Sequence, residues 1–432
     1  MPWANDTPRR YVSEHSCSYR ILDYLAQRQC LQQLQITWGS PWDVHVGTYP
    51  PLLFQDMRVL DLYIASPHDL SHVDFTAVNC GSKLKRLAIG ASKTAVRAVE
   101  SYFRDKIAEK SFGFTDLKEL SLYGLSFTNS LLRSSWQQIV SLPTVERLSI
   151  FDCIAIEVFA LELVRNLSDC ELGFQHLSIE CGNEGHDEGG AETLAGVLSR
   201  CKPLATLHLR TDLLPEKFWD YLVAHGPSLR TLAIDETDDH ADNGLKLDAE
   251  ALSKICQTCP KVLYFGFQLD RYAFMEPDWN TEYGYGEFLS CLGAMQGLRL
   301  VHLRLPLVGS YDTESWTEGA DSSNVTWNCQ KFCNGVFSYL EEHRLCPSLV
   351  TVVVGHHFEP ANVRNDRAGR NPWYYTRHCY IRGCQYDALN RKAAIAVPVP
   401  AYRVRELLPD CDLLDFDPAC NWVGGLPGRI QL

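Results

Sequence analysis

Residues Leu117–Leu122 read Leu-Lys-Glu-Leu-Ser-Leu: an apolar residue, two others, an apolar residue, one other and a third apolar residue. This pattern occurs eleven times along the chain, with starting points 25 to 51 residues apart. The copies begin at Leu31, Met57, Leu84, Leu117, Val145, Phe174, Leu204, Leu229, Val262, Leu298 and Leu349. We refer to the three apolar positions of each copy as its first, second and third motif positions.

A repeat of this length and spacing is typical of a leucine-rich-repeat solenoid, in which each unit packs only on its neighbours. Between the copies, segments such as residues 191–200, 218–225 and 249–257 have apolar residues at helical spacing and end near Gly or Pro. A helix can serve as the crossover between two parallel strands. We therefore predict an α/β horseshoe of about eleven irregular strand–helix repeats, with a parallel sheet on its concave face.

The regularity of the pattern sets the expected domain boundaries. Residues 1–18 form an N-terminal tail, and residues 19–355 form the solenoid, with insertions at 268–290 and 306–328. Residues 356–432 are expected to be an irregular basic and aromatic segment ending in a possible degenerate terminal cap, because an uncapped solenoid would expose its core.

Composition bears on the location and class of the protein. The chain has no run of about 18 apolar residues that could cross a membrane, and its first residues do not resemble a secretory signal. We therefore expect an intracellular protein, cytoplasmic or nuclear. The net charge of −13 argues against general affinity for nucleic acid.

The sequence contains no standard catalytic or nucleotide-binding signature, so we expect a protein that is not an enzyme and uses no cofactor. The spacing of Cys256 and Cys259 could suit zinc, but no second pair follows at zinc-finger spacing. Several of the seventeen cysteines, among them Cys201, Cys259 and Cys346, lie just before a motif copy. Packing at helix–strand junctions is the favoured interpretation, and no metal site is expected.

The expected binding surface lies on the concave strand face. Because strand side chains alternate, residues between and just after the second and third motif positions should point away from the core. Exposed aromatic and basic side chains in register would mark an interaction site. The expected protein-binding residues are Tyr63, Tyr123, Phe151, His208, Arg210, His302 and Arg304. We expect that replacing Tyr123 and Phe151 by Ser abolishes partner capture without unfolding the chain.

Two stretches resemble a known family. Residues 346–354, Cys-Pro-Ser-Leu-Val-Thr-Val-Val-Val, and residues 201–209, Cys-Lys-Pro-Leu-Ala-Thr-Leu-His-Leu, resemble the cysteine-containing repeat of F-box leucine-rich-repeat proteins of the divergent fungal type. The resemblance covers roughly residues 19–355. It implies a substrate-recognition module of a ubiquitin ligase that captures protein partners on its concave face. It implies a Skp-type adaptor and a cullin as partners only if an F-box precedes this sequence, because none is visible in it.

Two other functions stay open at this stage. The chain could be a stand-alone regulatory solenoid, similar to leucine-rich inhibitors or GTPase activators. Alternatively, residues 364–392, where arginines alternate with aromatic residues, could contact single-stranded nucleic acid by stacking and phosphate binding. A loop that packs its aromatic residues on the solenoid is the favoured interpretation of that segment.

Overall fold

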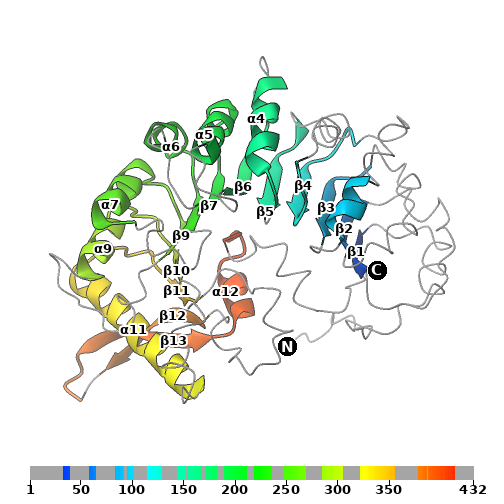
Figure 1. Ribbon diagram of the computed structural model, residues 1–432. Helices are drawn as coiled ribbons and strands as arrows, with labels where there is room; N and C mark the ends of the chain where they lie inside the picture. The colour runs from blue at the N-terminus through cyan, green and yellow to red at the C-terminus, as the bar shows by residue number, and fades with distance from the viewer. Residues whose placement is uncertain are drawn as a thin grey trace, which may run out of the picture. The chain divides into compact units, whose positions relative to one another are not determined.

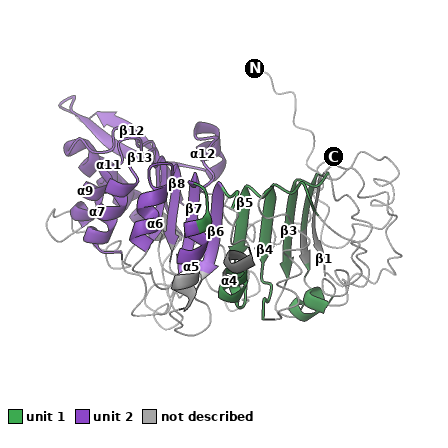
Figure 2. Cartoon of the chain, turned by 90° about the horizontal axis from the view of Figure 1, so that it is seen from above, with its two compact units in different colours: residues 1–174, 200–202, 421–432 green, residues 175–199, 203–420 purple. Residues whose placement is uncertain are grey.

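The chain divides into two compact units (Figure 2): residues 1–174, 200–202 and 421–432 form unit 1, and residues 175–199 and 203–420 form unit 2. The structure is a computed structural model. It describes residues 33–38, 58–64, 83–91, 95–101, 114–128, 144–151, 153–166, 172–181, 189–211, 218–235, 247–268, 285–304, 322–355, 378–386 and 388–413.

Unit 1 contains parallel strands that pair in chain order (Figure 1). They are β1 (Gln33–Trp38), β2 (Val59–Ile64), β3 (Arg86–Ala91), β4 (Glu119–Tyr123) and β5 (Arg147–Phe151), followed by helix α4 (Ile156–Asn166). Each strand begins close to the second motif position of one copy. Motif spacing thus predicted where the strands of this unit lie.

The strand register of unit 1 aligns equivalent motif positions. The second positions Leu60, Leu87, Leu120 and Leu148 are direct partners in adjacent strands, and each is at most 2% exposed. A shift of one residue would turn all of these leucines to the other face of the sheet. Burial of a leucine side chain stabilises the fold by about 1.5–3 kcal/mol. A shifted register would lose this stabilisation at every copy, so the repeated pattern itself specifies the register.

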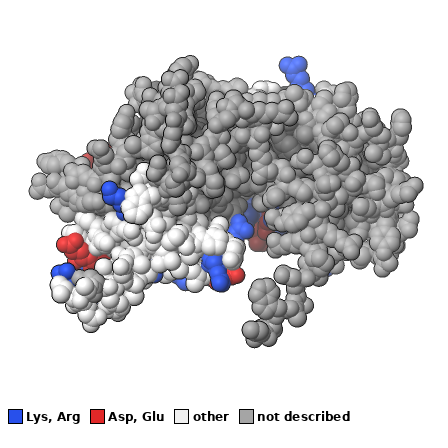
Figure 3. Space-filling model, turned by 90° about the horizontal axis from the view of Figure 1, so that it is seen from below, with Lys and Arg blue, Asp and Glu red and all other residues white. Residues whose placement is uncertain are grey.

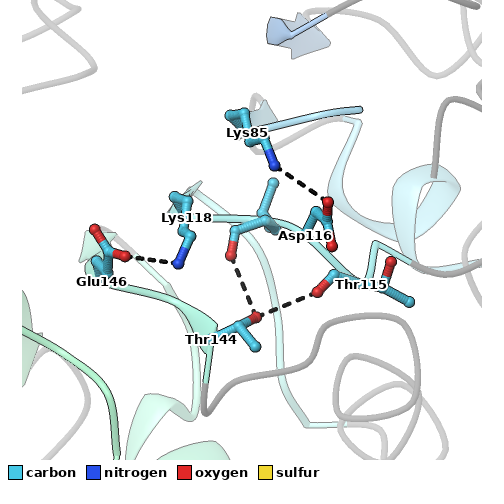
Figure 4. Close-up of polar contacts among 7 residues, drawn as sticks. Lys85, Thr115, Asp116, Lys118, Thr144 and Glu146 are labelled. Atoms are coloured by element: carbon cyan, nitrogen blue, oxygen red, sulfur yellow. Dashed lines mark hydrogen bonds and ion pairs between the residues drawn. The ribbon is translucent and has the colours of Figure 1, made fainter. Parts of the chain in front are cut away.

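Ion pairs connect neighbouring strands of unit 1 just before the strands begin (Figure 4). Lys85 Nζ lies 3.2 Å from Asp116 Oδ2, and Lys118 Nζ lies 2.6 Å from Glu146 Oε1. All four side chains are about half exposed, and exposed pairs of this kind contribute only about 0–1 kcal/mol. These pairs fit the register without determining it.

Unit 2 contains parallel strands followed by an antiparallel hairpin, also in chain order (Figure 1). The parallel strands are β6 (His176–Cys181), β7 (Thr206–Thr211), β8 (Thr231–Asp235), β9 (Tyr264–Gln268), β10 (Leu300–Arg304) and β11 (Thr351–Val354), and the hairpin strands are β12 (His378–Tyr386) and β13 (Lys392–Val399). The helices are α5 (Gly189–Arg200), α6 (Phe218–His225), α7 (Ala249–Thr258), α9 (Tyr285–Leu292), α11 (Ser322–Glu342) and α12 (Ala401–Leu407).

Helix α7 shows how the sequence specifies a crossover. The side chain of Asp248 accepts a hydrogen bond from the Ala251 amide at 2.7 Å and so caps the first turn. Leu252, Ile255 and Cys256 share one face and are buried, as their i, i+3, i+4 spacing requires. The described residues thus form a mixed α/β fold with a mostly parallel sheet, as expected from the alternation of strand and helix patterns.

Cysteines near the start of motif copies serve as buried packing residues. Cys259 and Cys346 are fully buried, and Cys346 Sγ donates a hydrogen bond to the Leu292 carbonyl at 3.2 Å. Burial raises the pKa of both thiols to about 12, which keeps them protonated and unreactive. Cys201 is partly exposed. Desolvation by burial nevertheless raises the pKa of its thiol to about 12.

The segment after residue 356 differs from the expected irregular one. Residues 378–386 and 392–399 form the β12–β13 hairpin, which pairs with β11 through β12. Strand β13 could not be predicted from the sequence because it contains Pro398, and proline is unfavourable in a strand except near an edge. After the hairpin, the described residues 401–413 begin with helix α12 and include no strand.

Helix α11 covers the outer edge of β13, the last strand of unit 2. Asn334 Oδ1 accepts a hydrogen bond from the Ala396 amide at 2.6 Å, and Gln330 Nε2 donates to the Ala396 carbonyl at 3.2 Å. Ser338 Oγ donates to the Ala394 carbonyl at 3.4 Å. An uncovered edge strand is a template for pairing with other chains. These side chains occupy backbone groups of β13 and so protect this edge of the sheet from such pairing.

Candidate protein-binding face

The residues expected to bind a partner lie on the predicted strands, but four of the five whose side chains are described are buried. Tyr123 and Phe151 in unit 1 are 5% and 4% exposed, and His208 and His302 in unit 2 are fully buried. The expectation of an exposed aromatic and basic surface is therefore wrong for these four. Alternation along a strand identifies the face on which a side chain lies, but it does not reveal what packs over that face.

The remaining three expected residues are Arg210, Tyr63 and Arg304. Arg210 is partly exposed, and its Nη1 lies 3.5 Å from Glu180 Oε1 on the neighbouring strand. The charge of Arg210 is thus balanced within the sheet. Tyr63 and Arg304 belong to strands β2 and β10, but their side chains lie outside the described part of the structure.

In unit 2 we call the strand face opposite to the motif positions the inner face. Its members include Ala233, Tyr264, Leu300 and Val353, which alternate with motif positions along their strands. These four form one buried cluster with residues from the end of the described chain: Val404, Leu408, Cys411 and Leu413. Figure 1 shows α12 on the side of the strands opposite to α6, α7 and α9. Residues 401–413, which we call the C-terminal segment, therefore cover the inner face.

A carboxylate-binding arrangement holds this segment in place. Thr231 Oγ1 donates a hydrogen bond to Asp412 Oδ1 at 2.7 Å, and Thr206 Oγ1 donates to Asp412 Oδ2 at 3.0 Å. His176 Nδ1 lies 3.5 Å from Asp412 Oδ2 and 2.9 Å from the Thr206 hydroxyl. The two threonines are 2% exposed. Hydrogen bonds to an ionised acceptor in such a site are about twice as strong as neutral ones.

The three polar residues come from three adjacent strands. His176, Thr206 and Thr231 are direct register partners in β6, β7 and β8, and each lies two residues after the first motif position of its copy. Their side chains therefore stand side by side on the inner face. The sheet alone positions them, since strand pairing sets the spacing between neighbouring side chains. We call His176, Thr206 and Thr231 the carboxylate-binding triad.

Sequence reasoning missed the triad and chose the next inner-face residues instead. His302, one of those chosen, has a structural contact: its Nε2 donates to the Gly355 carbonyl at 3.0 Å. The signal for the triad was present, because a His and two Thr lie two residues after the first motif position in three consecutive copies. The partner carboxylate had no such signal, since Asp412 lies 181 residues beyond Thr231.

The described part of residues 364–392, the segment considered for nucleic-acid binding, forms no concentrated positive surface. Arg382 Nη2 lies 3.3 Å from Glu341 Oε2, and Lys392 Nζ lies 4.0 Å from Glu341 Oε1. Tyr380 is buried, while Tyr386 is exposed. On the face shown in Figure 3, Lys and Arg side chains of the described surface are scattered and lie beside acidic ones in places. Residues 364–377 lie outside the described part of the chain.

Comparison with protein-family models gives no match for this sequence, and a search among curated proteins gives none either. Within the described ranges, no group of three or more His, Cys, Asp or Glu residues is arranged to hold a metal ion. Within those same ranges, no helix has the length and apolar character needed to span a membrane.

Proposed function

We propose that this chain is a leucine-rich-repeat protein-binding scaffold without enzyme activity, and that partners bind on the concave strand face. Three features support the proposal: motif copies in register, helices that serve as crossovers, and a strand face not used by those helices. The observation that carries it is the inner face of unit 2, where the strands already hold a stretch of chain through a carboxylate and apolar contacts. A face with these groups suits a peptide ligand.

The more specific form of the proposal is a substrate-recognition module of a ubiquitin ligase of the F-box type. Its support is the resemblance of residues 201–209 and 346–354 to the cysteine-containing repeat. Of the two cysteines that begin these stretches, Cys346 is fully buried and Cys201 is partly buried. A Skp-type adaptor and a cullin would then accompany the protein through an F-box supplied by a longer form of the chain.

The proposal is tested by site-specific photo-cross-linking in the native host. A photo-reactive amino acid replaces Arg210, which is partly exposed on the inner face. The matched control carries it in place of Val223, which is 59% exposed on helix α6. We expect discrete protein cross-links from position 210 and not from position 223. Cross-links only from position 223, or none from either position, would contradict the proposed binding face.

Mass spectrometry of the protein purified with its cross-linked partners distinguishes a ubiquitin-ligase receptor from a stand-alone regulatory solenoid. Co-purification of a Skp-type adaptor and a cullin supports a ligase receptor. Inner-face partners without these two proteins support a stand-alone regulatory solenoid. The described ion pairs of Arg382 and Lys392 with Glu341 give the nucleic-acid alternative no support.

A further inference from the structure

The C-terminal segment binds the inner face in the manner of a short peptide ligand. It contributes one carboxylate, Asp412, and four buried apolar side chains, Val404, Leu408, Cys411 and Leu413. Val404 and Leu408 are four residues apart and so lie on one face of a helical turn. Cys411 and Leu413 flank the aspartate. The recognised pattern is an apolar i, i+4 pair followed by an apolar–Asp–apolar tripeptide.

The groups that recognise the aspartate belong to the sheet. His176, Thr206 and Thr231 are held by the pairing of β6, β7 and β8, and the apolar partners Ala233 and Tyr264 lie on β8 and β9. Strand pairing sets their positions independently of residues 401–413. A carboxylate from another chain can therefore use the same hydroxyl groups if the C-terminal segment moves away.

The attachment of the segment favours its exchange. Helix α12 has only seven residues, and its N-cap residue Pro400 makes no side-chain capping bond. An isolated helix of this length is unstable in water. Tyr402 and Leu407 of this helix are 60% and 45% exposed, so these two large side chains add little to its attachment. Among the described contacts, four apolar side chains and one carboxylate anchor the segment on the inner face.

We infer that the inner face of unit 2 binds partner peptides in which an aspartate stands between apolar residues, and that residues 401–413 occupy this site as an intramolecular competitor. The inference rests on the proposed protein-binding function and names its ligand class. Because the competitor is tethered, its effective concentration at the site is high. The apparent affinity of the inner face for a partner peptide is therefore reduced. Weakening the C-terminal segment should therefore strengthen binding of a peptide in trans.

The test uses the full chain and a labelled synthetic peptide of residues 401–413. Asp412→Asn in the chain weakens the internal competitor and leaves the triad intact. The matched control is Asp410→Asn, which changes an exposed acidic residue of the same segment. We expect the peptide to bind the Asp412→Asn chain about tenfold or more tightly than the Asp410→Asn chain. Fluorescence anisotropy measures both affinities.

Two further variants test whether the triad recognises the carboxylate of the peptide. A peptide carrying Asn in place of Asp412 should bind the Asp412→Asn chain at least about tenfold more weakly than the native peptide. A chain that combines Thr206→Val and Thr231→Val with Asp412→Asn should lose the gain in binding. Should the Asp412→Asn chain fold poorly, Leu413→Ala weakens the same segment through an apolar anchor and serves the same comparison.

Equal affinity of the Asp412→Asn and Asp410→Asn chains for the native peptide would overturn the inference. So would equal binding of the Asp and Asn peptides. Hydrogen exchange separates this failure from failure of the proposed function. A partner that cross-links at position 210 while residues 401–413 keep their protection supports the binding face and refutes the competition. Specific peptide binding without any cross-linked partner supports the site and refutes the scaffold role.

Discussion

Thr231 Oγ1 donates a 2.7 Å hydrogen bond to Asp412 Oδ1, although 181 residues separate the two. This bond joins the start of a parallel strand to the end of the described chain. With the Thr206 hydroxyl on the other carboxylate oxygen, it fixes Asp412 on the inner face of unit 2. The geometry makes Asp412 the best-defined polar anchor of the C-terminal segment.

Replacing Thr231 with Val should loosen the C-terminal segment. The substitution keeps the shape of a side chain that is 2% exposed but removes the donor to Asp412. A bond to a charged acceptor contributes about 1.5–3 kcal/mol, so hydrogen exchange across residues 401–413 should accelerate by a factor of about ten or more. Thr231→Ser keeps the hydroxyl and is the control. Equal protection in both variants would show that the bond does not hold the segment.

Replacing Tyr123 or Phe151 with Ser should destabilise the fold, in contrast to what the sequence predicted. Both side chains are buried, at 5% and 4% exposure, and truncation of a buried aromatic residue costs about 3–5 kcal/mol. The urea midpoint of unfolding measures the effect. Tyr402→Ser, at an exposed position, should shift stability by less than about 0.5 kcal/mol. A midpoint unchanged by the two core substitutions would refute the observed burial.

His225 should make stability depend on pH. Its Nδ1 accepts a hydrogen bond from the Leu204 amide at 3.3 Å, and its Nε2 donates to the Leu198 carbonyl at 3.0 Å. Only the neutral ring can do both. Desolvation lowers the pKa of His225 below its usual 6.5, although the bond to Leu198 opposes that shift.

Because the folded pKa lies below the unfolded one, the unfolded state takes up the proton more readily. The contribution of His225 is complete above about pH 6.5 and is lost as the pH falls below the unfolded pKa. Denaturant unfolding at pH 7.5 and 5.5 should show this loss in the wild type and a smaller one in His225→Gln. His343→Gln, at an exposed residue, should keep the wild-type difference.

Replacing Asn334 with Ala should uncover the edge of β13. The Ala396 amide would lose its 2.6 Å acceptor, which costs about 1–3 kcal/mol if the amide stays buried. An uncovered edge also promotes association between chains. We expect a lower denaturation midpoint and more aggregation by light scattering. Ser338→Ala removes a longer contact of 3.4 Å to Ala394 and should have a smaller effect. The reverse order of the two effects would contradict this account.

The main elements of the fold could be predicted from the sequence because their signals are local. Segments 191–200, 218–225 and 249–257, expected as helices from apolar spacing, correspond to α5, α6 and α7. Strands β3 to β11 contain the second and third motif positions that predicted them. Periodicity within ten residues is enough for such predictions. The β12–β13 hairpin was missed because its pattern contains a proline and departs from the repeat.

The candidate site could be predicted only in part. Alternation along β7 puts His208 and Arg210 on the same strand face as Thr206. It does not predict that His208 is fully buried while Arg210 is partly exposed, and it did not lead to the triad. His176, Thr206 and Thr231 acquire their role only from a residue on a distant part of the chain.

By itself the sequence determined strands β3 to β11, the helices α5, α6 and α7, and the register, because a one-residue slip would turn the motif leucines away from the core. Tertiary structure decided which side chains of the inner face are accessible. It brought residues 401–413 over strands β8 to β11, buried Ala233 and Val353 beneath them and placed Asp412 against three strands. These contacts join residues far apart in the chain, and no local periodicity encodes which distant segment covers a strand face.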